Sequence, residues 1–262
     1  MVVQRIRQPR VAEIVAARLR EDILSGRLKE GDVLPSQEIL LSEFGVSPPA
    51  LREAIHILET DGLISVRRGN VGGAVVHQPS AERTAHMISM ALQSRSSTPA
   101  DVSGALLHLE PICAGMCAAR EDRATEVLPH LEAEICRQAE QFDDLSRYVP
   151  NARRFHEAIV SRCGNEPMIL LIGSLELIWS AHESSVWSDD NPADPMSRRT
   201  MRAALRDHQR LFDAIRDGDS ARAVRIAHGH LTVARRNTLV VGRDKIIEAR
   251  MISNGNHQEP GR

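Results

Sequence analysis

Three histidines are the residues of this sequence best suited to metal chemistry. His156, His208 and His230 each lie on the apolar side of a different stretch with helical periodicity. An imidazole that faces inward is costly unless its nitrogens find partners. Three neutral imidazoles that converge in one cavity suit a divalent ion such as Zn²⁺. The pattern therefore predicts a metal or effector site. The apolar neighbours are Ile159 and Val160 for the first histidine, Leu205 and Phe212 for the second, and Ala223 and Ala227 for the third.

The same histidines fit other interpretations, which the sequence leaves open. A single inward histidine is more often a hydrogen-bonded core residue than a ligand, and a metal-free apolar pocket is an alternative to a metal site. A catalytic ion would also need a general base. Glu157 is adjacent to His156, but adjacent residues on a helix diverge. The chain has no HExxH segment, nucleophile elbow or phosphate-binding glycine loop, so we expect no enzyme and keep a metal-dependent enzyme as the alternative.

Other side chains in the same half have weaker signals. His182 shares a predicted helix face with Trp179, which fits either a core histidine or a residue that lines an effector pocket. Cys113 and Cys117 lie one turn apart without a second pair of ligands, so we interpret them as small buried thiols. The pair formed by Met87 and Met90 is expected to fill the core.

The stretch Leu34–Gly73 predicts a second function, DNA binding. Two short helical patterns are joined by a turn at Gly45, and two strand-like segments follow at 64–67 and 74–77. Two helices joined by a short turn that contains glycine form the arrangement that places a helix in the DNA major groove. The loop between the two strands is basic and would form a wing beside that helix.

Within this stretch, polar residues mark the expected contacts with DNA. Ser36 and Ser47 are candidate N-caps for the two helices. On the second helix Arg52 and His56 recur on the side opposite the apolar residues, so they should face outward. The candidate DNA-binding residues are Ser36, Gln37, Ser47, Arg52, His56, Arg67, Arg68 and Gly69.

Composition bounds the class of protein. At 262 residues the chain is long enough for two domains with separate cores. Its 42% hydrophobic content and formal charge of −2 are typical of soluble proteins. No apolar run approaches the ~20 residues of a spanning helix and the N-terminus lacks an apolar signal-peptide core, so we expect a cytoplasmic protein outside the membrane. Four cysteines in this length do not suggest a disulfide framework.

Charge supports DNA binding only locally. Basic and acidic residues are equally numerous over residues 1–78, so this part of the chain is not basic overall. Phosphate contacts need positive charge at the contact surface rather than a high isoelectric point. The arginines of the N-terminal tail fit a solvated tail as well as a DNA contact, whereas the wing arginines favour DNA.

The pattern of the chain changes after residue 78, where strand-like segments give way to successive helical patterns. We predict a mainly α protein with a winged helix-turn-helix domain at 1–78, an all-α antiparallel helical bundle at 79–252 and a disordered tail at 253–262. The helices predicted outside the stretch Leu34–Gly73 are 11–26, 80–93, 101–120, 124–141, 145–163, 166–187, 197–217 and 219–240, with a weaker one near 243–251.

The first of these two domains resembles a known family. The motif LPSQ, followed by FGVS, LREA, DGLI, RRG and GG in order, is similar to the winged helix-turn-helix domain of GntR-type bacterial transcription regulators over about the first 78 residues. The family usually places an arginine at the positions of Glu38 and Pro48, and both commonly touch DNA. Of the recurrent DNA contacts, Arg52 and Arg68 are retained.

The second domain resembles the FCD effector domain of the FadR subgroup. The resemblance rests on RFHEA at 154–158, CGN at 163–165, DH at 207–208 and HL at 230–231. It implies a bundle that senses a small molecule and mediates dimerisation. The resemblance covers about residues 82–240.

Family membership would also imply a particular site. Many FCD domains bind a divalent metal through these three histidines and an aspartate one turn before the first, where this chain has Ala152. The arginine often found one turn before Glu110, which would pair with a carboxylate effector, is replaced by Leu106. A fatty acid, an acyl-CoA and a small carboxylate therefore all remain candidate effectors.

Together these features predict a ligand-responsive transcription regulator. It would bind a near-palindromic operator on double-stranded DNA as a homodimer, and a small molecule in the helical domain would change its affinity for the operator. A DNA-bending protein without an effector is a further alternative. The two differ in that a sensor gains thermal stability from its ligand.

Overall fold

The computed structural model describes residues 10–67, 73–142, 145–183, 198–238 and 245–249. The chain divides into two compact units, Met1–Ser80 and Ala81–Arg262, which we describe separately. The division lies two residues beyond the expected boundary at 78. The expected tail at 253–262 and the N-terminal arginines before Arg10 lie outside the described residues.

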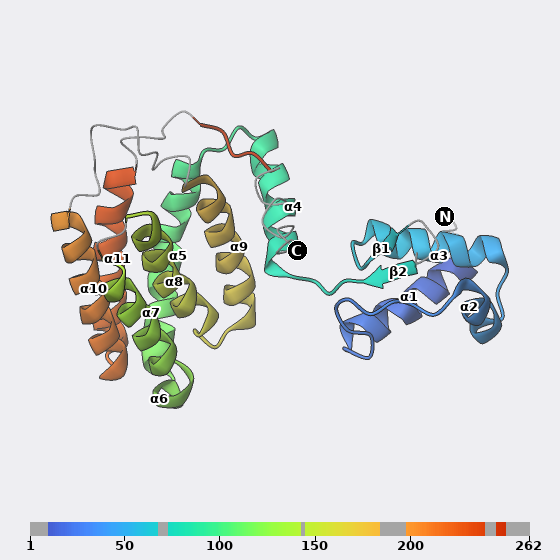
Figure 1. Ribbon diagram of the computed structural model, residues 1–262, viewed down its shortest axis with the longest axis horizontal. Helices are drawn as coiled ribbons and strands as arrows, with labels where there is room; N and C mark the ends of the chain where they lie inside the picture. Colours follow the sequence, from blue (N-terminus) through green and yellow to red (C-terminus); the bar gives the residue numbers. More distant parts are fainter. Residues whose placement is uncertain (1–9, 68–72, 143–144, 184–197, 239–244, 250–262) are drawn as a thin grey trace, which may run out of the picture. The chain divides into compact units, whose positions relative to one another are not determined.

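The first unit combines three helices with a small sheet (Figure 1). In β1 and β2 the strands are antiparallel, with Ile64 opposite Val76 and Arg67 opposite Gly73. The second strand therefore begins and ends one residue earlier than the expected 74–77. A bridge between Val33 and Val75 adds the preceding loop to the sheet. The elements are α1 (Val11–Leu24), α2 (Gln37–Phe44), α3 (Pro48–Thr60), β1 (Ile64–Arg67) and β2 (Gly73–Val76).

The turn between α2 and α3 is built from the expected residues. The Ser36 side chain accepts a hydrogen bond from the Ile39 N–H at 3.4 Å and caps α2. Gly45 ends that helix with φ of 61°, which a glycine adopts without strain. Ser47 is the N-cap residue of α3, but its side chain forms no capping hydrogen bond. Pro49 occupies the second helical position and lacks one of the N–H groups that a cap normally reaches.

The core of this unit lies between α1 and α3. Leu51, Ala54 and Leu58 of α3 are fully buried, which leaves the opposite side of the helix exposed. Of the apolar residues that recur at helical spacing on α1, Val15, Leu19 and Ile23 are buried as this spacing predicts, whereas Val11 and Ile14 are 52% and 56% exposed. Two small residues of α1 complete the inward face and allow α3 to approach closely. These are Ala12 and Ala16.

The second unit is all-α in its described part, as expected. The predicted helix at 124–141 is divided into two at Val127, whose side chain is fully buried. The weak helix expected near 243–251 is wrong for the described residues 245–249, which are not helical. The helices are α4 (Ala81–Ser94), α5 (Pro99–Ala119), α6 (Arg123–Glu126), α7 (Leu128–Glu140), α8 (Leu145–Ser161), α9 (Glu166–Glu183), α10 (Arg198–Arg216) and α11 (Ser220–Thr238).

Helix α5 is the central helix of this unit and packs against α8, α9, α10 and α11 (Figure 1). Thr98 and Asp101 form a capping box that fixes its start. Among the described helices it alone is long and apolar enough to cross a membrane by length and composition. We had expected no such apolar run. Its place in the core accounts for the composition, because a helix surrounded by other helices is apolar on most sides.

Helix α4 packs mainly on α9 and corrects one expectation. Its buried side is made by Ala85 and Ser89, both 0% exposed. Met87 and Met90, which we expected to fill the core, are 64% and 42% exposed. The helix therefore contacts the bundle through the two small residues Ala85 and Ser89 and through the partly buried Ile88 and Leu92.

Candidate functional site

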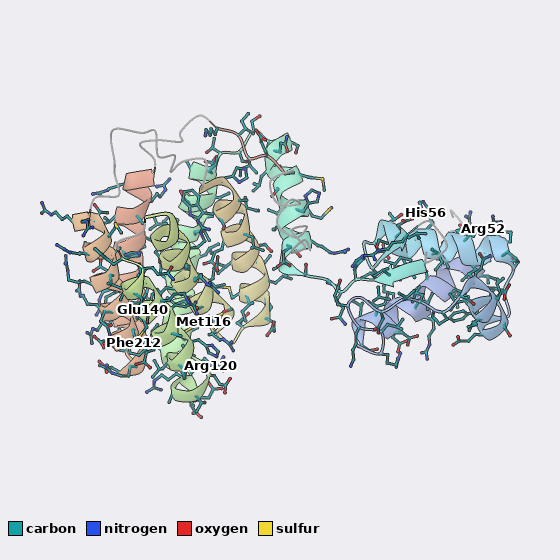
Figure 2. All side chains as sticks on the ribbon, in the orientation of Figure 1. Arg52, His56, Met116, Arg120, Glu140 and Phe212 are labelled. Carbon is teal, nitrogen blue, oxygen red and sulfur yellow. The ribbon has the colours of Figure 1, made fainter. Side chains whose placement is uncertain are left out.

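Helix α3 presents a polar face to solvent. Because Leu51, Ala54 and Leu58 hold the other face in the core, Arg52 and His56 are both exposed and lie one turn apart. Figure 2 shows the two side chains along the outer side of α3. This is the orientation that base-reading side chains of a helix-turn-helix protein require.

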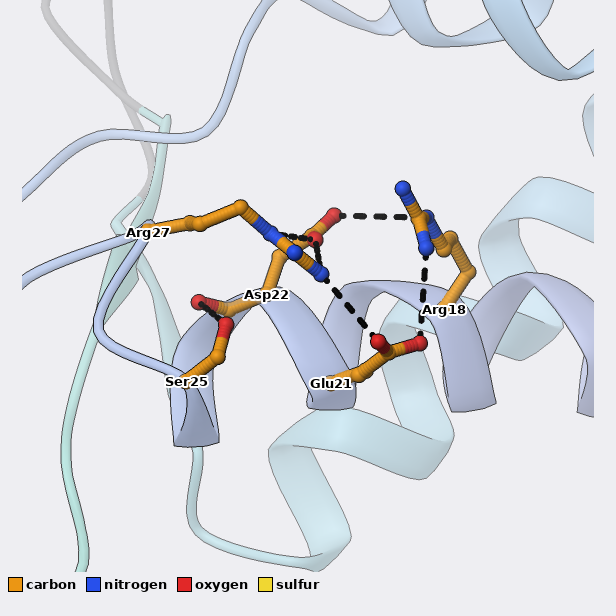
Figure 3. Close-up of polar contacts among 5 residues, drawn as sticks. All are labelled: Arg18, Glu21, Asp22, Ser25 and Arg27. Atoms are coloured by element: carbon orange, nitrogen blue, oxygen red, sulfur yellow. Dashed lines mark hydrogen bonds and ion pairs between the residues drawn. The ribbon is translucent and has the colours of Figure 1, made fainter.

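The arginines of the first unit differ in whether an acidic side chain pairs with them. Several of its arginines are paired with acids: in Figure 3, Arg18 and Arg27 contact Glu21 and Asp22 of α1. Likewise Arg20 pairs with Asp61, and Arg10 pairs with Glu53. In contrast, within the residues that the structure describes, Arg52 and the strand residue Arg67 form no ion pair. These two guanidinium groups remain available for an anionic partner.

The other expected DNA contacts divide into two groups. Ser36, Gln37 and Ser47 are exposed at or just before the starts of α2 and α3. The side chain of Ser47 is not used as a cap, which leaves its hydroxyl for solvent or a phosphate oxygen. Arg68 and Gly69, the expected tip of the wing, lie outside the described residues.

The three histidines of the second unit meet at one point. His208 Nε2 lies 3.2 Å from His156 Nε2 and 3.2 Å from His230 Nε2. The rings come from α8, α10 and α11, and the ligand atoms all lie within 4.8 Å of one another. Phe155 stacks on His208 with the ring centroids 4.3 Å apart and supports that ring from one side. We call these three histidines the triad.

Each ring of the triad has a polar partner on its outer nitrogen. His156 Nδ1 donates to Glu110 Oε1, and His208 Nδ1 donates to Gln138 Oε1 at 2.8 Å. His230 Nδ1 faces the carboxylate of Asp207 at 3.8 Å. In the neutral form, with its proton on Nδ1, each ring turns the lone pair of Nε2 toward the shared centre. This arrangement of outer partners is the one that orients histidines around a metal.

The outer partners also set the charge states of the rings. Burial, together with the neighbouring His230 and His156, holds the pKa of His208 well below its usual value. Burial also lowers the pKa of His230, although the nearby carboxylate of Asp207 opposes it. For His156, burial acts in the same direction but the Glu110 carboxylate outweighs it, so the pKa of His156 is raised. Two of the three rings are thus neutral, the form that a metal ion binds.

The donor set fits a divalent metal. Nitrogens bound to Zn²⁺ at about 2.0–2.1 Å in tetrahedral geometry lie about 3.3–3.4 Å apart. Two of the three Nε2 pairs in the triad are 3.2 Å apart, close to that spacing. Ala152, at the position where the resembling family has an aspartate, offers no ligand atom. A metal on this triad would therefore have a coordination position for water or for an oxygen of an effector.

Both ring nitrogens of His182 are hydrogen-bonded to backbone groups outside the triad. Its Nδ1 donates to Ile178 O at 2.8 Å and its Nε2 accepts from the Glu248 N–H at 2.9 Å. The side chain is only 3% exposed, in agreement with a core histidine. These contacts favour the core interpretation of His182 and do not support its expected role in lining the effector pocket.

The interpretation of the cysteines as buried thiols is confirmed. Cys113, Cys117 and Cys163 are at most 2% exposed. Burial raises the pKa of Cys113, and it raises the pKa of Cys117 to about 12. The thiols of Cys113 and Cys117 are therefore protonated at neutral pH.

The outer partners Glu110, Gln138 and Asp207 were missed at the level of sequence. A weak signal existed for two of them, since Gln138 lies on the apolar stripe of Leu131 and Ile135. Glu110 likewise interrupts the apolar helix α5, where it is 3% exposed. A polar residue on a buried stripe needs a partner. The partner itself lies on another helix and has no signal in sequence spacing.

Comparison with known proteins gives two matching families. The model of bacterial regulatory proteins of the gntR family matches residues 11–75. The FCD domain model matches residues 101–233, about half of the chain.

Individual relatives agree with these matches. Over 241 residues the chain is 24% identical to the HTH-type transcriptional repressor NanR of Klebsiella aerogenes, covering 90% of this chain and 88% of the relative. Over 71 residues it is 39% identical to the HTH-type transcriptional regulator Mce2R of Mycobacterium tuberculosis, covering 27% of this chain and 30% of that protein. A solved Streptococcus agalactiae GntR structure has a TM-score of 0.65 at 22% identity, covering 86% of this chain and 99% of the other, which shows a shared fold.

Proposed function

The chain belongs to the GntR family of bacterial regulatory proteins and carries an FCD domain, and from this premise we propose that it binds a near-palindromic operator as a homodimer. It is a ligand-responsive DNA-binding transcription regulator and not an enzyme. In a twofold dimer the two copies of α3 would enter successive major grooves on one side of the duplex. The relatives are bacterial regulators, and the cytoplasm, where the operator DNA lies, is the compartment that we propose for this chain.

One observation carries the DNA-binding part of the proposal. Arg52 is exposed on the outer face of α3 and, within the described part of the chain, has no acidic partner. An arginine in this position can donate two hydrogen bonds to the major-groove edge of guanine. His56, one turn further along, is exposed on the same face. The two side chains together form the surface that would read the sequence.

For the sensor part, we propose that the triad holds a divalent metal such as Zn²⁺. When bound, the metal would supply a Lewis acid that attracts an oxygen ligand. The triad residues hold the metal through Nε2, and Glu110, Gln138 and Asp207 keep the three rings oriented. A small carboxylate, a fatty acid or an acyl-CoA would bring the oxygen that the position of Ala152 does not supply. The effector would favour one state of the dimer and so change operator affinity.

The DNA-binding proposal is tested by selecting a binding site from a pool of random duplexes and measuring affinity at physiological salt. We expect a near-palindrome, and we expect Arg52→Ala to weaken specific binding by about 5–150-fold, which corresponds to about 1–3 kcal/mol. Arg18→Ala is the matched control, because that exposed arginine is already paired with Glu21 and Asp22. Equal affinity for random duplex, or equal effects of the two substitutions, would contradict the proposal.

A further inference from the structure

A five-residue segment near the C-terminus is fastened to three different elements of the second unit. We call residues 245–249 the strap; Figure 1 shows it in red beside the end of α4. Three consecutive N–H groups of the strap are hydrogen-bonded. Ile247 donates to Ser97 O at 3.0 Å, in the loop after α4. Glu248 donates to His182 Nε2 at 2.9 Å, and Ala249 donates to Gln93 Oε1 at 3.0 Å.

The strap is also anchored by packing. Ile247 is 0% exposed and belongs to the apolar core of the second unit, and Ala249 is 7% exposed. The neighbouring Ile246 is 46% exposed, so one side of the strap is buried and the other faces solvent. On α4, His86 Nδ1 adds a contact with Ala249 O at 3.3 Å. Because the strap is bonded to α4 and to α9, it links these two helices.

Helix α4 is the element whose position depends on the strap. Its start lies against Ser174 of α9, whose hydroxyl oxygen is 3.3 Å from Ala81 O and 2.6 Å from Leu170 O on its own helix. Its far end is held by the strap through Gln93. Its packing face consists of the fully buried Ala85 and Ser89 and the partly buried Ile88 and Leu92. Along the chain, α4 directly follows the DNA-binding unit, which ends at Ser80.

Helix α9 connects the strap to the helix that carries the first triad residue. The fixed tautomer of His182, with Nδ1–H on Ile178 O, makes Nε2 the acceptor for the strap. Two residues before His182, the hydroxyl of Ser180 accepts a hydrogen bond from Arg153 of α8. Arg153 lies one turn before His156. A shift of α8 on ligand binding would therefore be passed to α9 and to the strap.

We propose that the strap is a regulatory latch that fixes α4 to α9 and transmits occupancy of the triad to α4. This inference rests on the proposed function, because it assumes that the triad is the sensor. The latch would be closed when His182 accepts the Glu248 N–H. Loss of that acceptor would remove the hydrogen bond between the strap and α9 and leave the strap bonded only to α4 and the loop that follows it.

The test is hydrogen exchange of the full chain, read by mass spectrometry with and without one equivalent of Zn²⁺ alone. We expect Zn²⁺ to slow exchange of the α4 amides by about fivefold, the change expected for one hydrogen bond. His182→Phe should abolish this effect and leave Zn²⁺ binding by the triad unchanged. His182→Gln places an acceptor near the position of Nε2 and should restore the effect. His130→Phe, at an exposed position on α7, is the matched control.

The outcomes separate the latch from the proposed function. If Zn²⁺ binds but α4 exchange does not change, or changes equally in His182→Phe, the latch is wrong and the sensor stands. If no Zn²⁺ binds, the metal proposal fails. The latch is then tested without metal, where α4 should exchange about fivefold faster in His182→Phe than in His182→Gln. Should His182→Phe not fold, Gln93→Leu removes another acceptor of the strap from an exposed position, and unchanged α4 exchange in that variant refutes the latch.

Discussion

Substituting Glu110 by glutamine tests whether the triad is a metal centre with an oriented outer shell. Glu110 is 3% exposed, and its carboxylate accepts the Nδ1 proton of His156. Glutamine keeps the shape and an acceptor oxygen but removes the charge. The variant thus changes the strength of one hydrogen bond without opening a cavity.

The magnitude follows from the kind of hydrogen bond that is lost. A hydrogen bond to a charged group contributes about 1.5–3 kcal/mol, and a neutral one contributes about 0.5–1.5 kcal/mol. The difference of about 1–1.5 kcal/mol corresponds to a roughly tenfold loss of Zn²⁺ affinity. This agrees with the ~10–100-fold loss seen when outer partners of metal ligands are removed. The direction is set by electrostatics, since a carboxylate makes the imidazole a stronger donor toward the metal.

The assay is competition for Zn²⁺ with a chromophoric chelator at constant pH and salt. His208→Ala is the positive control, because it deletes the ligand whose Nε2 lies 3.2 Å from both other rings. Glu157→Gln is the matched control, since the charge of Glu157 also raises the pKa of His156 but, among the described residues, Glu157 forms no hydrogen bond with a triad ring. Affinity in Glu110→Gln within twofold of the native value, with a large loss in His208→Ala, would refute the role of the outer shell. Equal affinities in all variants would refute the metal site itself.

Two further predictions concern the scaffold. Phe155→Ala should destabilise the second unit by about 3–5 kcal/mol in urea unfolding, because a fully buried ring that also supports His208 is removed. A destabilisation below about 1 kcal/mol would mean that the neighbouring side chains fill the space left by the Phe155 ring. Gly45→Ala should destabilise the first unit by about 1–2 kcal/mol, because φ at that position is 61°. Gly173→Ala should have the opposite effect. Gly173 lies in the middle of α9, where alanine is the better helix former, and the structure has open space around the added Cβ, so the free energy of unfolding should rise by up to about 1 kcal/mol. Stabilisation by both substitutions would contradict the backbone argument.

Periodicity identified the helices and the inward direction of the triad, because both depend on spacing within one helix. His208 illustrates this: it lies among Leu211, Phe212 and Ile215 on the buried side of α10, as the sequence pattern predicted. Cap chemistry likewise placed the turn at Gly45. The inward face of a helix and the residue that ends it depend on neighbouring residues, so both can be predicted from a short stretch of sequence.

The outer shell could not be predicted because it joins distant segments. Gln138 and His208 are 70 residues apart in sequence, and Glu110 and His156 are 46 apart. No periodic pattern relates positions on different helices. For the same reason the inward face of α1 was predicted only in part: its first apolar residues, Val11 and Ile14, are exposed, and the small residues Ala12 and Ala16 share the buried face.

The pairing of arginines in the first unit bears on how the protein distinguishes its operator from other DNA. Non-specific affinity comes from phosphate neutralisation, so each arginine already paired with an acid contributes less to it. Arg18, Arg20 and Arg27 are paired in this way, whereas Arg52 has no acidic partner among the described residues. Base contacts from α3 then make up a larger share of the total binding energy. A neutral domain with a localised cation therefore gains discrimination between sequences at the cost of overall affinity, and a ligand that repositions α3 has a proportionally larger effect.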